Sequence, residues 1–202
     1  MAEPASSRFF IALRPDFRAA SRLGKLAADL ALRCRGRALA ARDLHLTLAF
    51  IGERPFAEAD RLTALLDGLP VTLPGFALDT VGRFGPELLW IGPSALPDWA
   101  AELNAAVRDR LRAAEVAFDR KPFNAHLTLV RHARDRAAAE RATGPLPPGR
   151  AFPVDHWRLL LGGTHPAPTP LRRYFWHRPH GDAASDEPLD DGAPGGRHRS
   201  VT

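Results

Sequence analysis

The chain has 202 residues, of which 45% are hydrophobic, which is enough for one domain or for two small lobes that share a core. Its single cysteine, Cys34, excludes an intramolecular disulfide and a metal site built from several cysteines. The net charge is +5, and residues 181–202 hold five acidic residues against two arginines, so the rest of the chain is more basic and suits a polyanionic partner.

No apolar run approaches the roughly 20 residues of a membrane-spanning helix. The first residues also lack a basic segment followed by a long apolar run, the pattern of a secretory signal. We therefore expect a cytoplasmic protein.

Strands and helices are expected to alternate along the chain. Residues 8–13 predict a first strand, and Asp16 is placed to cap a helix that runs to about Arg33 with Phe17, Leu23, Leu26 and Leu30 as its apolar stripe. The remaining expected elements are, in order, a strand at 44–50 ending at Gly52, a helix at 58–66, strands at 76–81 and 87–91, a long amphipathic helix at 98–115, a strand at 125–130, a short helix at 135–141, and closing strands at 154–161 and 172–176.

The phrase His-Leu-Thr-Leu occurs twice, at residues 45–48 and 126–129, each time inside an apolar run. Strand alternation places His45 and Thr47 on one face, and His126 and Thr128 on one face of the second strand. The same alternation assigns Leu44, Leu46, Leu48 and Phe50 to the opposite face in the first copy, and Ala125, Leu127 and Leu129 in the second.

Paired histidines and threonines fit the hydrolysis of a phosphate ester without a metal. One neutral imidazole can take a proton from water while one imidazolium gives a proton to the leaving oxygen. The threonine hydroxyls can donate hydrogen bonds to the non-bridging oxygens. A single His-x-Thr is more often structural, but its repetition favours catalysis by His45 and His126.

The chain resembles the 2H phosphoesterase superfamily and, within it, the LigT-like RNA 2′,3′-cyclic phosphodiesterases of the bacterial and archaeal 2′-5′ RNA ligase family. The matching segments are residues 8–13, 45–52, 120–131 and Thr169-Pro170-Leu171. The sequence departs from the family at Ala125, where proline often precedes the histidine, and at Pro168, where tyrosine is common.

The resemblance implies an α+β fold that is bilobal and duplicated, with two antiparallel-rich sheets around a central cleft and helices outside. It also implies hydrolysis of RNA 2′,3′-cyclic phosphate ends to a 2′-phosphomonoester, with reversible 2′–5′ ligation as a side activity. His45 is then the proton donor and His126 the acceptor, although the sequence leaves these roles interchangeable. Thr47 and Thr128 would bind the phosphoryl oxygens, and no metal or cofactor is expected.

Two further residues are candidates for substrate binding. Arg131 follows the second motif, and the resemblance favours a phosphate or RNA contact, although alternation places it on the leucine face. Phe123 precedes the second motif and is the preferred ring for stacking on a base, ahead of Phe10, Phe50, Phe84 and Trp90.

We expect one bilobal domain at residues 1–180, in a monomeric protein, to be followed by a disordered acidic tail at 181–202. Two alternatives remain open: another superfamily enzyme that acts on cyclic nucleotides or 2′–5′ oligonucleotides, and a noncatalytic RNA-binding module.

Overall fold

The computed structural model describes residues 5–165 and 174–179. The elements of the first half are β1 (Ser6–Pro15), α1 (Phe17–Cys34), β2 (Arg37–Ala38), η1 (Ala41–Asp43), β3 (Leu46–Pro55), η2 (Phe56–Glu58), α2 (Ala59–Ala64), β4 (Thr72–Leu78) and β5 (Thr80–Phe84). Those of the second half are β6 (Leu88–Gly92), α3 (Asp98–Ala113), β7 (Leu127–Arg131), α4 (Arg136–Arg141), β8 (Gly144–Pro145), β9 (Phe152–Thr164) and β10 (Tyr174–His177). The four expected helices and both motif strands are therefore confirmed, but β3 and β7 begin at Leu46 and Leu127, so His45 and His126 directly precede the strands in which they were expected to lie.

Within the described residues, the strands form one ten-stranded sheet in the order β10-β9-β1-β3-β7-β6-β5-β8, with β2 paired to β7 and β4 to β9. All the pairings are antiparallel. The α+β class predicted from the sequence is confirmed. The two expected sheets are hydrogen-bonded to each other through β3 and β7 and form one continuous sheet.

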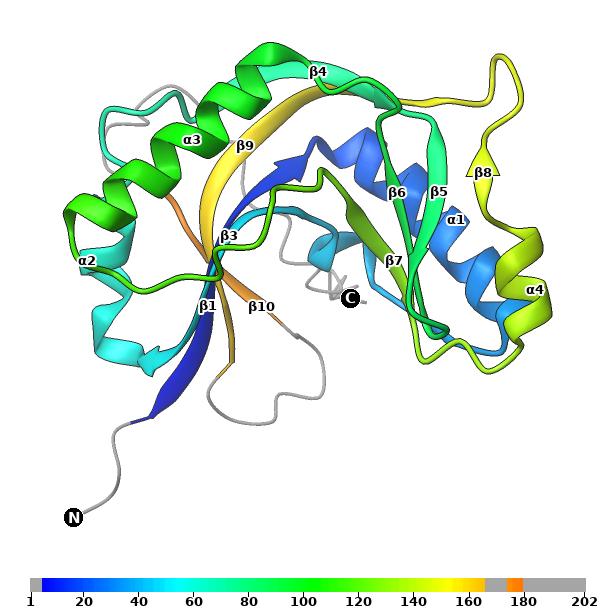
Figure 1. Cartoon of the computed structure of the whole chain (residues 1–202), viewed down its shortest axis with the longest axis horizontal. Coiled ribbons are helices and arrows are strands. Elements are labelled where there is room, and N and C mark those ends of the chain that lie inside the picture. The colour runs from blue at the N-terminus through cyan, green and yellow to red at the C-terminus, as the bar shows by residue number, and fades with distance from the viewer. Residues whose placement is uncertain (1–4, 166–173, 180–202) are drawn as a thin grey trace, which may run out of the picture.

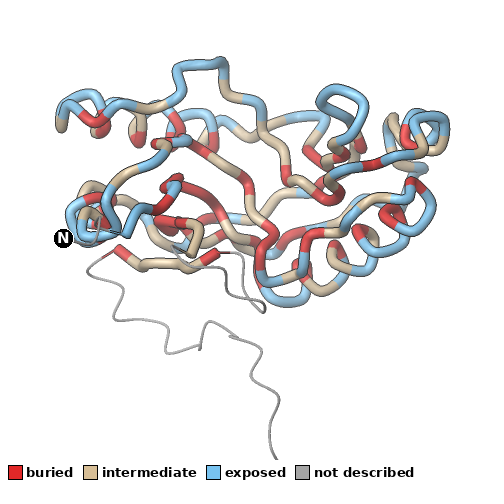
Figure 2. The backbone as a smooth tube through the Cα atoms, turned by 90° about the horizontal axis from the view of Figure 1, so that it is seen from below, coloured by how far each residue is buried: buried red, intermediate tan, exposed pale blue. Residues whose placement is uncertain are grey.

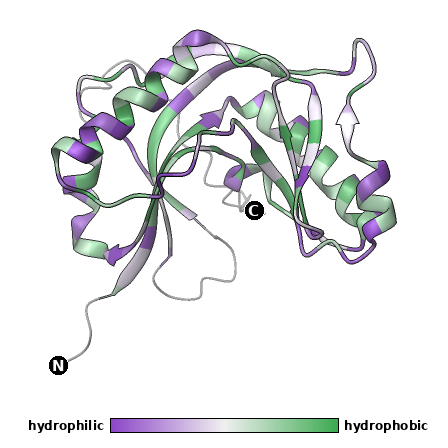
Figure 3. Ribbon diagram, in the orientation of Figure 1, coloured by the Kyte–Doolittle hydropathy of each residue, from purple (hydrophilic) through white to green (hydrophobic). Residues whose placement is uncertain are grey.

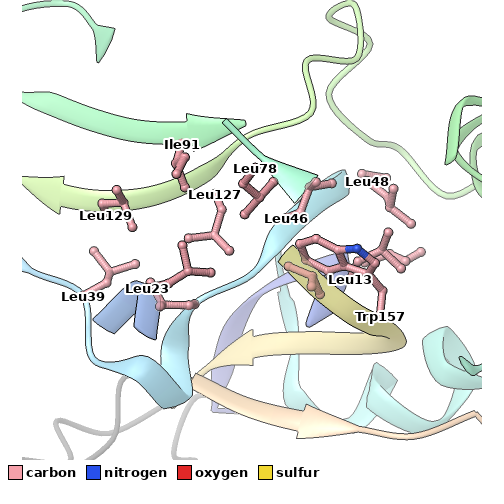
Figure 4. Packing of buried hydrophobic residues seen from close by; sticks show 14 of the residues in the cluster. Leu13, Leu23, Leu39, Leu46, Leu48, Leu78, Ile91, Leu127, Leu129 and Trp157 are labelled. Carbon is pink, nitrogen blue, oxygen red and sulfur yellow. The ribbon is translucent and has the colours of Figure 1, made fainter. Parts of the chain in front are cut away.

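The junction lies between the two motif strands. In the described part of the chain, β3 and β7 share one register pair, Leu46 opposite Leu127. Both leucines are at most 1% exposed, and Figure 4 shows them among the leucines of a common core. Because Leu46 and Leu127 point into the core, the residues on either side of each face the other way.

The helices cover the outer side of the curved sheet, with α2 and α3 over one half and α1 and α4 over the other (Figure 1). Asp16 caps α1, because its Oδ1 accepts a hydrogen bond of 2.8 Å from the Ala19 amide. Buried and exposed residues alternate along the helices (Figure 2), as do hydrophobic and hydrophilic ones (Figure 3). This is the pattern of amphipathic helices that pack on a sheet.

Two expectations about these elements were wrong. Phe17 is 66% exposed, because it lies about 200° around α1 from Ala19, which is in the core. The strand expected at 76–81 is two strands, β4 and β5, which separate at Asp79 because β4 pairs with β9 and β5 pairs with β6. The carboxylate of Asp79 accepts hydrogen bonds from the amide and hydroxyl of Ser94, which fix the break and lower the pKa of Asp79.

The expected acidic tail at 181–202 and the segment Thr169-Pro170-Leu171 lie outside the described residues. Within the described part of the chain, no helix is both long enough and apolar enough to cross a membrane.

Candidate active site

Each motif strand contains a β-bulge at the second leucine of His-Leu-Thr-Leu. In the pairing of β1 with β3, Ala12 lies opposite Thr47 and Ile11 lies opposite Ala49, so Leu48 is an extra residue. In the pairing of β6 with β7, Trp90 lies opposite Thr128 and Leu89 lies opposite Val130, which leaves Leu129 as the extra residue. A bulge of this kind reverses the alternation of the residues that follow it.

The bulges bring Phe50 and Arg131 to the face that carries the histidines. Ala49 and Val130 turn into the core, at 2% and 0% exposure. Phe50 lies opposite Phe10, while Arg131, one residue beyond Val130, returns to the side of Thr128. Simple alternation was therefore wrong for Phe50 and Arg131, which stand at the same distance after His45 and His126.

We call this side of the sheet the histidine face. It is defined by residues that the strand registers place on one side: Phe10, Ala12, Thr47, Phe50, Gly82, Phe84, Trp90, Thr128, Arg131, Gly162, Tyr174 and Trp176, together with His45 and His126, which directly precede β3 and β7.

The bulge in β3 is held by a residue of α3. Asn104 is 5% exposed and its amide donates a hydrogen bond of 2.7 Å to the carbonyl of Leu48. A bulged residue is left out of the strand ladder, so this carbonyl needs a partner from another element. Asn104 provides it and thereby supports the conformation that turns Phe50 outward.

Both histidines are held in the same tautomer. Nδ1 of His45 lies 2.7 Å from the carbonyl of Asp43, and Nδ1 of His126 lies 2.8 Å from the carbonyl of Asn124. A carbonyl only accepts hydrogen bonds, so each Nδ1 carries the proton and donates it. Nε2 is consequently the nitrogen that can exchange a proton with a substrate in both rings.

The surroundings of the two rings differ. His45 stacks on Phe10 at 4.6 Å and 19°, and it meets Tyr174 and Trp176 edge-on at 5.2 and 5.4 Å. His126 meets Phe84 edge-on at 4.7 Å, with Trp90 farther away at 6.1 Å. His45 is therefore the more enclosed ring.

This enclosure lowers the basicity of His45. Burial, together with the positive charges of Arg131 and Arg14 and the nearby His126, lowers the pKa of His45 to about 4, against the raising effect of its hydrogen bond to Asp43. Burial and Arg131 lower the pKa of His126 in the same direction. The charge of Arg131 acts on both histidines, so it lies near the pair, as expected for a residue that contacts a phosphate.

The junction of β3 and β7 brings the two His-x-Thr motifs together. Extending the antiparallel register by one residue from Leu46 and Leu127 sets His45 opposite Thr128 and Thr47 opposite His126. About the pair of Leu46 with Leu127, the two motifs are related by an approximate two-fold rotation, and His126 is close enough for its charge to lower the pKa of His45.

Phe123 has a different position from these residues. It is partly buried and packs against the main core, whereas Phe50 and Phe84 are 37% and 41% exposed. The guanidinium of Arg8 lies 5.6 Å from the ring of Phe50. In the described residues, no group of three or more His, Cys, Asp or Glu side chains is arranged to hold a metal ion.

Sequence patterns did not indicate Asn104, the ring of Phe10 against His45, or the contacts of Tyr174 and Trp176. Each comes from a strand or helix distant in the chain. The hydrogen bonds at Nδ1 differ from these contacts because they are local in the sequence. In both copies the accepting carbonyl lies two residues before the histidine.

Comparison with known proteins places the chain in a family. The family model described as the 2′-5′ RNA ligase superfamily matches residues 15–165. An RNA 2′,3′-cyclic phosphodiesterase of Escherichia coli (strain K12) is 36% identical over 117 residues, which is 56% of this chain and 62% of that relative.

Solved structures of E. coli LigT share the fold. The apo form is 27% identical with a TM-score of 0.62, and the complex with 3′-AMP is 25% identical with a TM-score of 0.66. Each comparison covers 86% of this chain and 96% of the LigT chain.

Proposed function

The chain belongs to the 2′-5′ RNA ligase superfamily, and we propose that it hydrolyses RNA 2′,3′-cyclic phosphate ends to a 2′-phosphomonoester. One observation carries the proposal: two imidazoles with the same tautomer stand on one face, beside two threonines and an arginine. The related E. coli phosphodiesterase and the LigT complex with 3′-AMP support the choice of substrate.

In the proposed mechanism, His126 takes a proton from water at Nε2 while His45 gives a proton from Nε2 to the departing 3′-oxygen. The P–O3′ bond breaks and the phosphate stays on the 2′-oxygen. Thr47 and Thr128 donate hydrogen bonds to the non-bridging oxygens, and Arg131 balances their charge. No metal or cofactor takes part in these steps.

The assignment of His45 as the acid requires that the substrate raises its pKa. A phosphodiester is an anion, and an anion interacts more strongly with a charge in a buried site than in an exposed one. The enclosure that lowers the pKa of His45 in the free protein therefore also makes that pKa respond most to a bound phosphate. His126, which is more open, is the better position for an entering water.

The mechanism is reversible, so the same site would join a cyclic phosphate end to a 5′-hydroxyl end through a 2′–5′ linkage. We further propose that the protein acts as a monomer in the cytoplasm.

The test is a comparison of substrates with EDTA present. We expect efficient turnover of a short RNA with a 2′,3′-cyclic phosphate end, slower turnover of cyclic mononucleotides, and a product that carries a 2′-phosphate. Preference for a cyclic mononucleotide or a 2′–5′ oligonucleotide would assign the chain to another activity of the superfamily. Binding of RNA without turnover of any substrate would indicate a noncatalytic module.

A further inference from the structure

Phe84 is an exposed aromatic ring beside the second histidine. It is the last residue of β5, and the residue is 41% exposed. Gly82 lies opposite Trp90, which lies opposite Thr128, so Gly82 and Phe84 share the histidine face. The strand register, and not only proximity, therefore directs Phe84 to the site.

Neighbouring side chains hold the ring of Phe84 in place. It meets His126 edge-on at 4.7 Å and Trp90 at 5.5 Å. Trp90 lies flat over Gly82, where a Cβ would come within 2.1 Å of the indole. Arg83 forms an ion pair of 3.3 Å with Glu140, which ties the end of β5 to α4. An exposed but supported ring of this kind loses little conformational freedom when a flat ligand stacks on it.

The other exposed ring on the histidine face is in a different half of the sheet. Phe50 is on β3, the strand that follows His45, whereas Phe84 is on β5, and β7 and β6 lie between them. The rings that enclose His45 are Phe10, Tyr174 and Trp176, of which the first two are at most 8% exposed. Among the described residues of the histidine face, the exposed rings are thus Phe50 and Phe84, one on each side of the histidine pair.

We propose that Phe84 is the stacking platform for the base of a second nucleoside, the one that supplies or releases a 5′-oxygen at His126. This inference rests on the proposed function. In hydrolysis, water occupies the position next to His126 and no second base is present. In ligation, a 5′-hydroxyl takes the place of that water, and its nucleobase comes within reach of a ring that touches His126.

The bond changes balance in both directions. In ligation, the 5′-hydroxyl gives its proton to Nε2 of His126, the P–O5′ bond forms, the P–O3′ bond breaks, and His45 gives its proton to O3′. In cleavage of a 2′–5′ linkage, the 3′-hydroxyl gives its proton to His45, the P–O3′ bond forms, the P–O5′ bond breaks, and His126 protonates O5′. The second direction can be measured with a small substrate.

The experiment compares kcat/KM for two substrates: a short RNA that ends in a 2′,3′-cyclic phosphate, and 2′–5′-linked diadenosine monophosphate. Phe84→Leu keeps an apolar contact with His126 but removes the aromatic face. Because stacking of a base on an aromatic ring is worth roughly tenfold or more, we expect Phe84→Leu to lower kcat/KM for the dinucleotide at least tenfold more than for the cyclic end. Phe84→Tyr should restore the dinucleotide reaction.

Phe17→Leu is the matched control, because Phe17 is an exposed phenylalanine at the start of α1, on the helical side of the sheet. An equal loss for both substrates would show that Phe84 only positions His126, and would overturn the proposal. No loss for either substrate, or a wild type that hydrolyses the cyclic end but does not cleave the dinucleotide, would also overturn it. A wild type that is inactive on the cyclic end would instead overturn the proposed function.

Discussion

Asn104 donates its 2.7 Å hydrogen bond to the carbonyl of Leu48, the extra residue of the bulge in the first motif strand. A side chain of α3 therefore supports the local backbone of the histidine face from the core side of the sheet. The link explains how a helix on the core side of the sheet influences the residues around the histidines.

Replacing Asn104 with leucine should destabilise the protein. The Leu48 carbonyl would be buried without a partner, and leaving such a group unsatisfied costs about 1–3 kcal/mol. Urea denaturation of Asn104→Leu should show a decrease of that size in the free energy of unfolding. Glu102→Gln, an exposed change on the same helix, is the control, and equal stabilities of the two variants would contradict the role of Asn104.

The stability of the protein should fall as the pH decreases from 7 toward 4, in part because of His45. An unfolded histidine titrates near pH 6.5, and the pKa of His45 is lowered to about 4 in the fold. Between these values the unfolded chain binds more protons, so acidification favours unfolding by about 3 kcal/mol from this group. The measurement is urea denaturation at several pH values for the wild type and for His45→Gln.

The carboxylates contribute equally to the pH dependence of the wild type and of His45→Gln. The difference between the unfolding free energies of the two proteins therefore isolates the contribution of His45. The variant should lose less stability than the wild type over this pH range. If the unfolding free energies of the two proteins decreased in parallel with pH, His45 would have an ordinary pKa in the fold.

Removing the charge of Arg131 should raise the pKa of both histidines, because its guanidinium lowers both. An NMR titration of the imidazole signals would measure the two shifts in Arg131→Gln. Arg33→Gln removes an equal charge from the exposed side of α1 and should leave both pKa values in place. A shift confined to one histidine would place Arg131 away from the pair.

Gly162 leaves room for the ring that stacks on His45. A Cβ at this position would lie 2.4 Å from Phe10 and 2.8 Å from Trp176, so Gly162→Ala must displace these rings. Overpacking of this kind costs about 1–3 kcal/mol, and turnover should fall because His45 loses its support. Adding Phe10→Leu should recover stability but not turnover, and recovery of both would show that stacking on His45 is unimportant.

The sequence was most informative where local pattern determines structure. Alternation in the two motifs predicted both strands and the shared faces of His45 with Thr47 and of His126 with Thr128. Asp16 was correctly predicted as the cap of α1, because a capping side chain bonds within its own first turn.

The errors arose where distant segments determine the backbone. Nothing local in His-Leu-Thr-Leu reveals a bulge, since it depends on the register with β1 or β6 and, for Leu48, on Asn104. Phe50 and Arg131 were consequently placed on the wrong face. The single pair of Leu46 with Leu127, which joins the two motifs, also depends on contacts between segments 81 residues apart.

The most direct test of the two-histidine mechanism is the rate at which His45→Ala, His126→Ala and the double variant hydrolyse an RNA with a 2′,3′-cyclic phosphate end in EDTA. Loss of one proton-transfer group should lower kcat by about 10²–10⁴-fold. Because the two groups act in one step, the double variant should be little worse than either single variant. Activity within a few-fold of the wild type in either single variant would contradict the mechanism.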